Sequence, residues 1–311
     1  MAARDLCTLA RAYQDLQGVT NVDSLLSTLI TSVSDAIQKW CRRDFVSTSY
    51  DELYSGNGDR KLLLRQYPII SVQSVRYRPV TVIKITNTVA ANVQGRVTVT
   101  STGLTLVRVN AGVKTTDTSV TFAGTATLTA LAAAVNALGN GWSAQVIGDS
   151  TNYGSWPSAD LYWPPAFPTF GAGSTGQGAL QCVNGSFAEL KMHTYELAGF
   201  QWDSRGWLLR AIPYTDPELQ HPEDLVWPVG INNIRVQYTA GYGTIPESVQ
   251  EACASWVGAL YYQCTRDPQL TNQLTAGGAA SGWKGAAGEP PDHVVALLRP
   301  YRRHTISTDQ S

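Results

Sequence analysis

A glycine-rich run, Gly171-Ala172-Gly173-Ser174-Thr175-Gly176, is the pattern closest to a ligand-binding motif in this sequence. Its spacing matches GxGxxG, in which the glycines let the backbone approach the pyrophosphate of a dinucleotide at a helix start. That site needs a buried strand before the glycines and an apolar helix after them. Pro164, Pro165 and Pro168 precede the run instead, and no apolar helix follows it. We therefore predict no cofactor here.

The histidines and carboxylates show no spacing that would assemble a metal site or a catalytic site. HxH or HxxxH spacing places two imidazoles on one face of a strand or helix, and it is absent among His193, His221, His293 and His304. Paired carboxylates such as Asp51-Glu52 are adjacent, so on a strand they point apart. The sequence also lacks a GxSxG elbow and a Walker A loop. We predict neither a metal site nor an enzyme.

The cysteines and the apolar runs indicate the cellular compartment in which the protein is made. The five cysteines are far apart and form no CxxC pair (Cys7, Cys41, Cys182, Cys253 and Cys264), so neither a disulfide framework nor a zinc site is expected. Asp5 and Arg11 interrupt what would be the apolar core of a signal peptide. No apolar run approaches the roughly 18 residues of a membrane span. We expect synthesis in the cytoplasm and no membrane contact.

A basic cluster lies close to the C-terminus, at Arg299, Arg302, Arg303 and His304. One interpretation is a solubilising terminus. The other is a docking peptide whose apolar side chains bury in a partner's groove while its arginines meet carboxylates at the rim. The docking residues would be Val294, Val295, Leu297, Leu298, Arg299, Tyr301, Arg302 and Arg303. A glycine-rich stretch, residues 267–291, precedes them and is typical of a flexible linker.

Three helices are predicted to form a core. Residues 22–43 carry apolar side chains at steps of three and four, which places them on one helix face. Asp23 or Asn21 is suited to cap the start of that helix. A shorter amphipathic helix over residues 6–16 precedes it, and a third helix opens at Pro246. The inward faces comprise Leu26, Ile30, Val33, Ile37, Trp40, Val249, Cys253, Trp256 and Leu260.

Strand patterns predict an antiparallel meander beside these helices. Alternating runs lie on both sides of a turn at Gly56-Asn57-Gly58-Asp59, and Pro68 marks a corner in the second run. The pattern resumes at residues 207–212 and 233–238. The predicted fold is therefore α+β, with a helical core, an antiparallel β meander and an extended C-terminal tail.

An insertion of different composition, residues 80–195, separates the two halves of this core. It is almost free of Lys and Glu, with strand patterns at residues 97–100, 104–109, 119–122 and 142–147 and a helix at 128–138. We predict a small α+β domain, inserted between core segments 1–79 and 196–266 and followed by a tail, residues 267–311.

An aromatic and proline-rich arm ends this insertion and supports an alternative function. Its residues Trp156, Tyr162, Trp163, Phe167 and Phe170 follow no period. Exposed aromatic rings stack on sugars, which would make this a glycan- or receptor-binding module, but they also pack into neighbouring subunits. Both interpretations predict a partner-facing arm.

Overall composition excludes two further classes. The 311 residues are 43% hydrophobic and 15% charged, with 23 Lys and Arg against 24 Asp and Glu and a net charge of −1. A basic nucleic-acid binder would show an excess of cations. A disordered chain would combine low hydrophobicity with high net charge.

In three segments the sequence resembles the head–tail connector (adaptor) proteins of tailed bacteriophages. These are LLSTLITSVSDAIQKWCRRDF, YDELYSGNGDRKLLLRQYPIISVQSV and INNIRVQYTAGYGTIPESVQEACASWVGALYY. They keep the family's order of helix, meander, strand with a glycine turn, and last helix. The long insertion departs from the compact members of the family.

The resemblance implies a non-enzymatic structural protein of the virion neck, made in the host cytoplasm. It implies a homo-oligomeric ring, typically of about twelve copies, beneath the portal protein. Such a ring continues the channel for double-stranded DNA, serves genome ejection and presents a surface to tail or neck proteins. The helical core, with the inward faces named above, would face neighbouring subunits and the channel. The C-terminal tail would reach into the portal. The insertion would reinforce the ring, form a collar or attach fibres or spikes.

Overall fold

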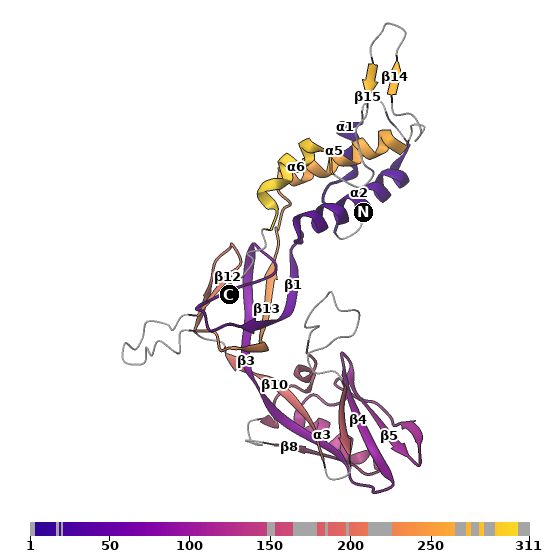
Figure 1. The fold of residues 1–311 in the computed structure, drawn as a ribbon, viewed down its shortest axis with the longest axis vertical. Helices are drawn as coiled ribbons and strands as arrows, with labels where there is room; N and C mark the ends of the chain where they lie inside the picture. The colour runs from indigo at the N-terminus through magenta and orange to yellow at the C-terminus, as the bar shows by residue number, and fades with distance from the viewer. Residues whose placement is uncertain are drawn as a thin grey trace, which may run out of the picture.

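The computed structural model describes residues 4–16, 19, 21–147, 153–163, 179–183, 186–196, 199–210, 226–264, 272–274, 280–282 and 290–303. The fold is α+β, as predicted. Three parts follow one another along the long axis of the molecule: a group of helices, a pair of central sheets, and an inserted module at the opposite end (Figure 1).

The helical end contains α1 (Leu9–Asp15), α2 (Asp23–Cys41), α5 (Glu247–Cys264) and α6 (Asp292–Leu298). Their apolar faces share one core, which buries side chains such as Leu26, Ile30, Ile37, Val249 and Val257. Arg11 on α1 reaches α5, where its guanidinium lies 2.6 Å from Glu247 and 2.7 Å from Glu251. The helices predicted from sequence periodicity are thereby confirmed.

The start of α2 differs from the prediction. Val22 occupies the N-cap position and no side chain caps it, so the expected cap by Asp23 or Asn21 is wrong. Asp23 is already the first helical residue, and its carboxylate accepts a hydrogen bond from the Tyr13 hydroxyl at 2.5 Å. That contact holds the end of α1 against the start of α2.

Two antiparallel sheets form the centre. The larger has the order β1 (Thr48–Gly56), β13 (Gly230–Ala240), β3 (Ile69–Asn87) and β10 (Ala188–Glu196). The smaller has the order β11 (Phe200–Trp202), β12 (Trp207–Arg210) and β2 (Lys61–Leu63). Trp227 and Tyr238 are fully buried in the apolar cluster to which both sheets contribute. The predicted meander strands are present.

Strand β3 is much longer than expected. The first core segment was predicted to end at residue 79, but β3 continues to Asn87. The apolar side chains of Val82, Ile83 and Ile85 explain the extension, because they are fully buried in the core of the inserted module. β10 pairs with β3 along much of this length, so the chain enters and leaves the module on neighbouring strands.

The module begins with β4 (Asn92–Thr100), β5 (Gly103–Asn110), β6 (Val113–Thr116) and β7 (Val120–Thr121). Helix α3 (Leu128–Ala137), β8 (Trp142–Val146), the 3-10 turn η1 (Ser158–Leu161) and β9 (Ala179–Val183) complete it. Its sheet has the order β6-β5-β4-β9, while β8 pairs with β3. Gly95 allows close packing inside, because a Cβ there would lie 2.8 Å from Cys182 Sγ and 2.9 Å from Trp142. Strands β6, β9 and β10 were not predicted.

The predicted flexible linker contains regular structure. Within residues 267–291, β14 (Asn272–Leu274) and β15 (Ala280–Gly282) pair as an antiparallel ladder. In Figure 1 this pair lies at the helical end of the molecule.

Candidate functional site

The C-terminal segment is a short helix that packs on the protein's own core. Residues expected within an extended tail form α6 and the 3-10 turn η4 (Arg299–Tyr301), beside α5 in Figure 1. Pro291 precedes the first turn, where a proline leaves no helical hydrogen bond unmade. Val294 and Leu298 are fully buried in the helical core. Only part of the predicted docking set is therefore on the surface.

Tyr301 and Arg303, close to the end of the described chain, contact residues that link the helices to the central sheets. The Tyr301 ring packs against Phe45 at 5.9 Å and Tyr242 at 6.4 Å between centroids. Arg303 donates from its backbone N–H to the Cys41 carbonyl at 2.9 Å, and its Nη1 donates to the Arg65 carbonyl at 2.6 Å.

The surface of the segment is cationic. The Arg302 guanidinium lies 4.8 Å from the ring centre of Trp40, on the helical end. Arg299 is exposed, while Val295 and Leu297 are half-buried. These side chains can meet a partner while Val294 and Leu298 stay buried.

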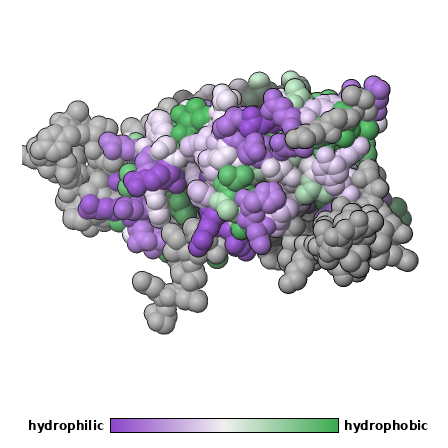
Figure 2. Space-filling view, turned by 90° about the horizontal axis from the view of Figure 1, so that it is seen from above, coloured by the Kyte–Doolittle hydropathy of each residue, from purple (hydrophilic) through white to green (hydrophobic). Residues whose placement is uncertain are grey.

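The predicted helix-core residues face inward. Seven of them are buried (Leu26, Ile30, Val33, Ile37, Val249, Cys253 and Trp256), and Trp40 and Leu260 are half-buried. A neighbouring copy would therefore meet other side chains, such as Leu25 and Tyr262, which are exposed. In the view of Figure 2, hydrophobic residues form small areas separated by hydrophilic ones. Ring contacts made by these helices stay a prediction.

The described part of the aromatic arm packs against the module. Trp163 is buried, its Nε1 donates to the Lys191 carbonyl at 3.1 Å, and its ring lies 4.4 Å from that of His193. The half-buried Trp156 packs against Tyr153 with the two rings tilted, 4.7 Å between ring centroids. Tyr162 is half-buried against the same core. Phe167, Phe170 and the glycine-rich run at 171–176 lie outside the described residues.

A buried polar junction joins the central sheet to the module, and sequence analysis did not predict it. Arg76 on β3 contacts Asp160 of η1 at 2.7 Å. Arg235 on β13 binds both Asp51 carboxylate oxygens, at 2.9 and 2.6 Å, and its Nη1 donates to the Asp160 carbonyl at 3.3 Å. Both arginine side chains are only 6% exposed. The available signal was an arginine between apolar neighbours in each strand.

His193 lies beside this junction and is neutral at pH 7. Burial lowers its pKa to about 4, and the nearby cations Arg235 and Arg76 act in the same direction. Its Nε2 lies 3.2 Å from the Asn232 carbonyl, so the proton is on Nε2. The buried Nδ1 has no hydrogen-bond partner among the described residues. With no nucleophile placed against it in these contacts, the residue is a packed core histidine.

The described residues contain no group of three His, Cys, Asp or Glu side chains that could hold a metal ion. No helix in the same part of the chain has the length and apolar character needed to cross a bilayer.

Comparison with known proteins gives a family match. Residues 8–150 match the family model described as head completion protein. The match runs from α1 through α2 and the first central strands and past β8 of the module. It confirms the resemblance to head–tail connector proteins drawn from the sequence, and with it a structural role in the head–tail part of a virion.

Two solved structures are also similar to this chain. One is described as the neck of an empty gene transfer agent (GTA) particle computed with C6 symmetry, with 11% identity, a TM-score of 0.42, and coverage of 100% of this chain and 97% of that chain. The other is described as the virion of a native GTA particle, with 12% identity, a TM-score of 0.41, and coverage of 97% and 91%. No curated protein matches the sequence.

Proposed function

We propose that this protein, matched by the head completion family over residues 8–150, is a non-enzymatic connector that forms a ring beneath the portal of a tailed virion. The ring extends the DNA channel and offers a surface to tail or neck proteins. The family match carries this proposal, because residues 8–150 include the first two of the three segments on which the connector resemblance rests.

The shape of the subunit supports contacts with different partners at its two ends. The helical end and the inserted module are separated by the central sheets along the long axis (Figure 1). The exposed Arg299 and Arg302 belong to the helical end, which we assign to the portal. The module at the opposite end is then left for tail or neck proteins.

The C-terminal segment could dock in two ways, either with α6 in place or with α6 released from the helical core. Arg299 and Arg302 can meet carboxylates of the portal while α6 stays in place. Val294 and Leu298 can enter a portal groove only if α6 leaves the helical core, because both are fully buried there.

The glycan- or receptor-binding alternative is less well supported. It depends on exposed aromatic rings, and Trp163 is buried with its indole N–H satisfied. Trp156 and Tyr162 pack against the module core.

Electron microscopy of the purified full-length protein, alone and mixed with portal, tests the proposal. We expect rings, or monomers that become a ring on the portal. A protein that stays monomeric and does not sediment with portal particles would contradict it.

A charge variant then tests the role of the tail without disturbing the core. Replacing Arg299 and Arg302 by Gln removes two surface cations and leaves Val294 and Leu298 buried, so we expect weaker portal binding by a folded protein. The matched control replaces Arg42 and Arg60, two other exposed arginines, by Gln. Equal portal binding by both variants would exclude docking through Arg299 and Arg302.

A further inference from the structure

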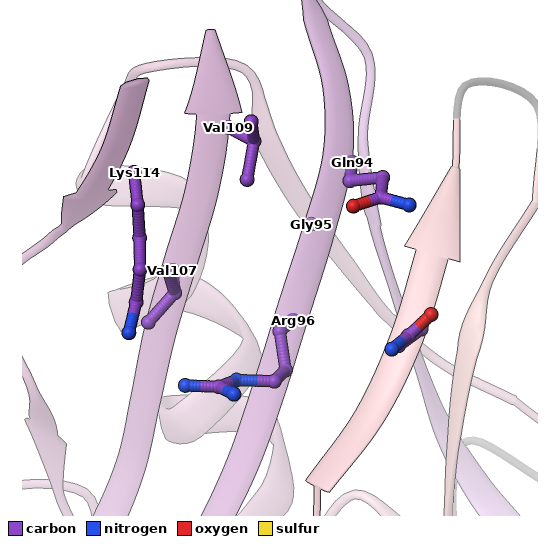
Figure 3. A pocket seen from close by; sticks show the side chains of 7 residues that line it. Gln94, Gly95, Arg96, Val107, Val109 and Lys114 are labelled. Atoms are coloured by element: carbon purple, nitrogen blue, oxygen red, sulfur yellow. The ribbon is translucent and has the colours of Figure 1, made fainter. Parts of the chain in front are cut away.

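The outer face of the module's sheet carries a shallow hollow of about 160 Å³. Its lining comes from adjacent strands: Arg96 on β4 is opposite Val107 on β5 and Gln181 on β9, and Val109 on β5 is opposite Lys114 on β6. Figure 3 shows the Arg96 and Lys114 side chains beside Val107, with Gln94 on the other side of Arg96. The hollow thus combines two cations with an apolar floor.

These two cations lack a carboxylate partner in the described structure. Arg96 and Lys114 are exposed, and neither takes part in any ion pair between described residues. Asp117, the acidic residue that follows β6, is engaged elsewhere: it pairs with Arg108 at 3.1 Å and accepts from Trp142 Nε1 at 2.7 Å. The hollow is therefore electrostatically complementary to an added anion.

The floor of the hollow further limits which side chains a bound partner would carry. Val107 and Val109 point to the same side of the sheet as Arg96, because they alternate with the inward Leu104 and Leu106. Gln94 and Gln181 at the rim offer amide groups that can hydrogen-bond a peptide backbone. An extended segment whose acidic and apolar side chains are two residues apart points both to the same side, and so satisfies all three groups at once.

We propose that this hollow binds an acidic segment of a partner protein, with a carboxylate seated between Arg96 and Lys114 and an apolar side chain on Val107 and Val109. A nucleic acid is a poorer fit. Two cations neutralise about two phosphates, far fewer than the six to ten contacts of a typical duplex binder. A phosphate backbone also leaves the valines uncovered. The inference goes beyond the connector role and holds whether or not the protein forms a ring.

Fluorescence anisotropy with full-length protein and two labelled peptides tests this. The probe is Glu-Ser-Val-Ser-Glu, in which the Glu and Val side chains share one face of the extended peptide, and its neutral match is Gln-Ser-Val-Ser-Gln. We expect saturable binding of the acidic peptide and at least about tenfold weaker binding of the neutral one, since charge-assisted hydrogen bonds are lost.

Three variants locate the site. The double variant R96Q/K114Q should bind the acidic peptide at least about tenfold more weakly than the parent does. Val109→Thr should weaken it by about fourfold through the lost apolar contact. The control R42Q/R60Q has the same net charge as the double variant and should bind like the parent. All five substituted residues are at least partly exposed, so unchanged urea midpoints are expected.

Three results would overturn the proposal. One is no saturable binding of the acidic peptide up to about 1 mM, the weak end of measurable affinities. Another is equal weakening by R96Q/K114Q and R42Q/R60Q, which would indicate net charge alone. The last is tighter binding of inorganic polyphosphate or a short DNA duplex at the same hollow, which would assign it to phosphate polymers instead.

Discussion

Arg76 and Arg235 place two guanidiniums in the interior, where each depends on a carboxylate. Removing one partner of a buried ion pair leaves an uncompensated charge, which costs more than the pair itself contributes. At the residue scale, this junction is where single substitutions should have their largest effect, because buried arginine side chains from the paired strands β3 and β13 hold η1 there.

Asp160→Ala should lower the free energy of unfolding by about 3 kcal/mol, because the Arg76 guanidinium then stays buried without the Asp160 carboxylate. Urea denaturation measures the loss. The control is Asp35→Ala, which removes an exposed pair with Lys39 and should change stability by less than about 0.5 kcal/mol. Similar losses in the two variants would show that the junction contributes no more than a surface pair.

His193 predicts a pH dependence whose sign follows from its lowered pKa. Between the unfolded value of 6.5 and the folded value of about 4, the unfolded chain binds a proton and the folded chain does not. Stability is therefore fully present above pH 6.5 and falls as the pH drops through this window, by about 2 kcal/mol at pH 5. Urea unfolding at pH 7 and pH 5 measures it. His193→Gln should remove this part of the loss, and an unchanged pH dependence in that variant would refute the assignment.

At the element scale, α6 shows how a short helix is held by a few contacts. Seven residues do not form a stable helix alone in water, so its stability comes from the burial of Val294 and Leu298. The turn that follows adds the Tyr301 packing and the Arg303 hydrogen bonds.

Leu298→Ala should therefore detach α6 or cost about 3 kcal/mol through the cavity left behind. Amide hydrogen exchange over residues 292–301 reports detachment, and urea denaturation reports a global loss. Leu297→Ala, at a half-buried neighbour, should lose less than half as much. If both variants protect the α6 amides equally well and unfold together, the helix is not anchored by Leu298.

At the scale of the whole molecule, the near-zero net charge determines how strongly the protein attracts DNA. Each cation that pairs with a phosphate strengthens DNA binding and makes it salt dependent. In the proposed connector role, a channel rich in such cations would retain the DNA, whereas a net charge of −1 on 311 residues gives little attraction.

Duplex DNA should accordingly bind the full-length protein only weakly, with a shallow dependence on salt. Fluorescence anisotropy across a salt series measures the slope of log affinity against log salt concentration, expected to be smaller in magnitude than about 2. A slope several times steeper would mean that the fold gathers cations on one surface despite the neutral composition.

The sequence by itself determined the elements whose signals are local. The apolar steps of α2 and α5, the alternation in β4 and β5, and the helix α3 all report which side of an element is buried, and that information repeats every few residues. The order of these elements also carried the resemblance to head–tail connector proteins. The extra length of β3 was not predicted, because the apolar side chains of its second half are buried in the core of the module rather than in that of the central sheets.

Only the tertiary structure decided which distant residues meet. Arg76 and Asp160, or Val294 and the core between α2 and α5, are far apart along the chain, and no periodicity pairs them. The same holds for the hollow, where Arg96 and Lys114 come together through strand register across β4, β5 and β6. Register and long-range packing depend on the free energy of the whole fold, so they become visible once the strands are placed side by side.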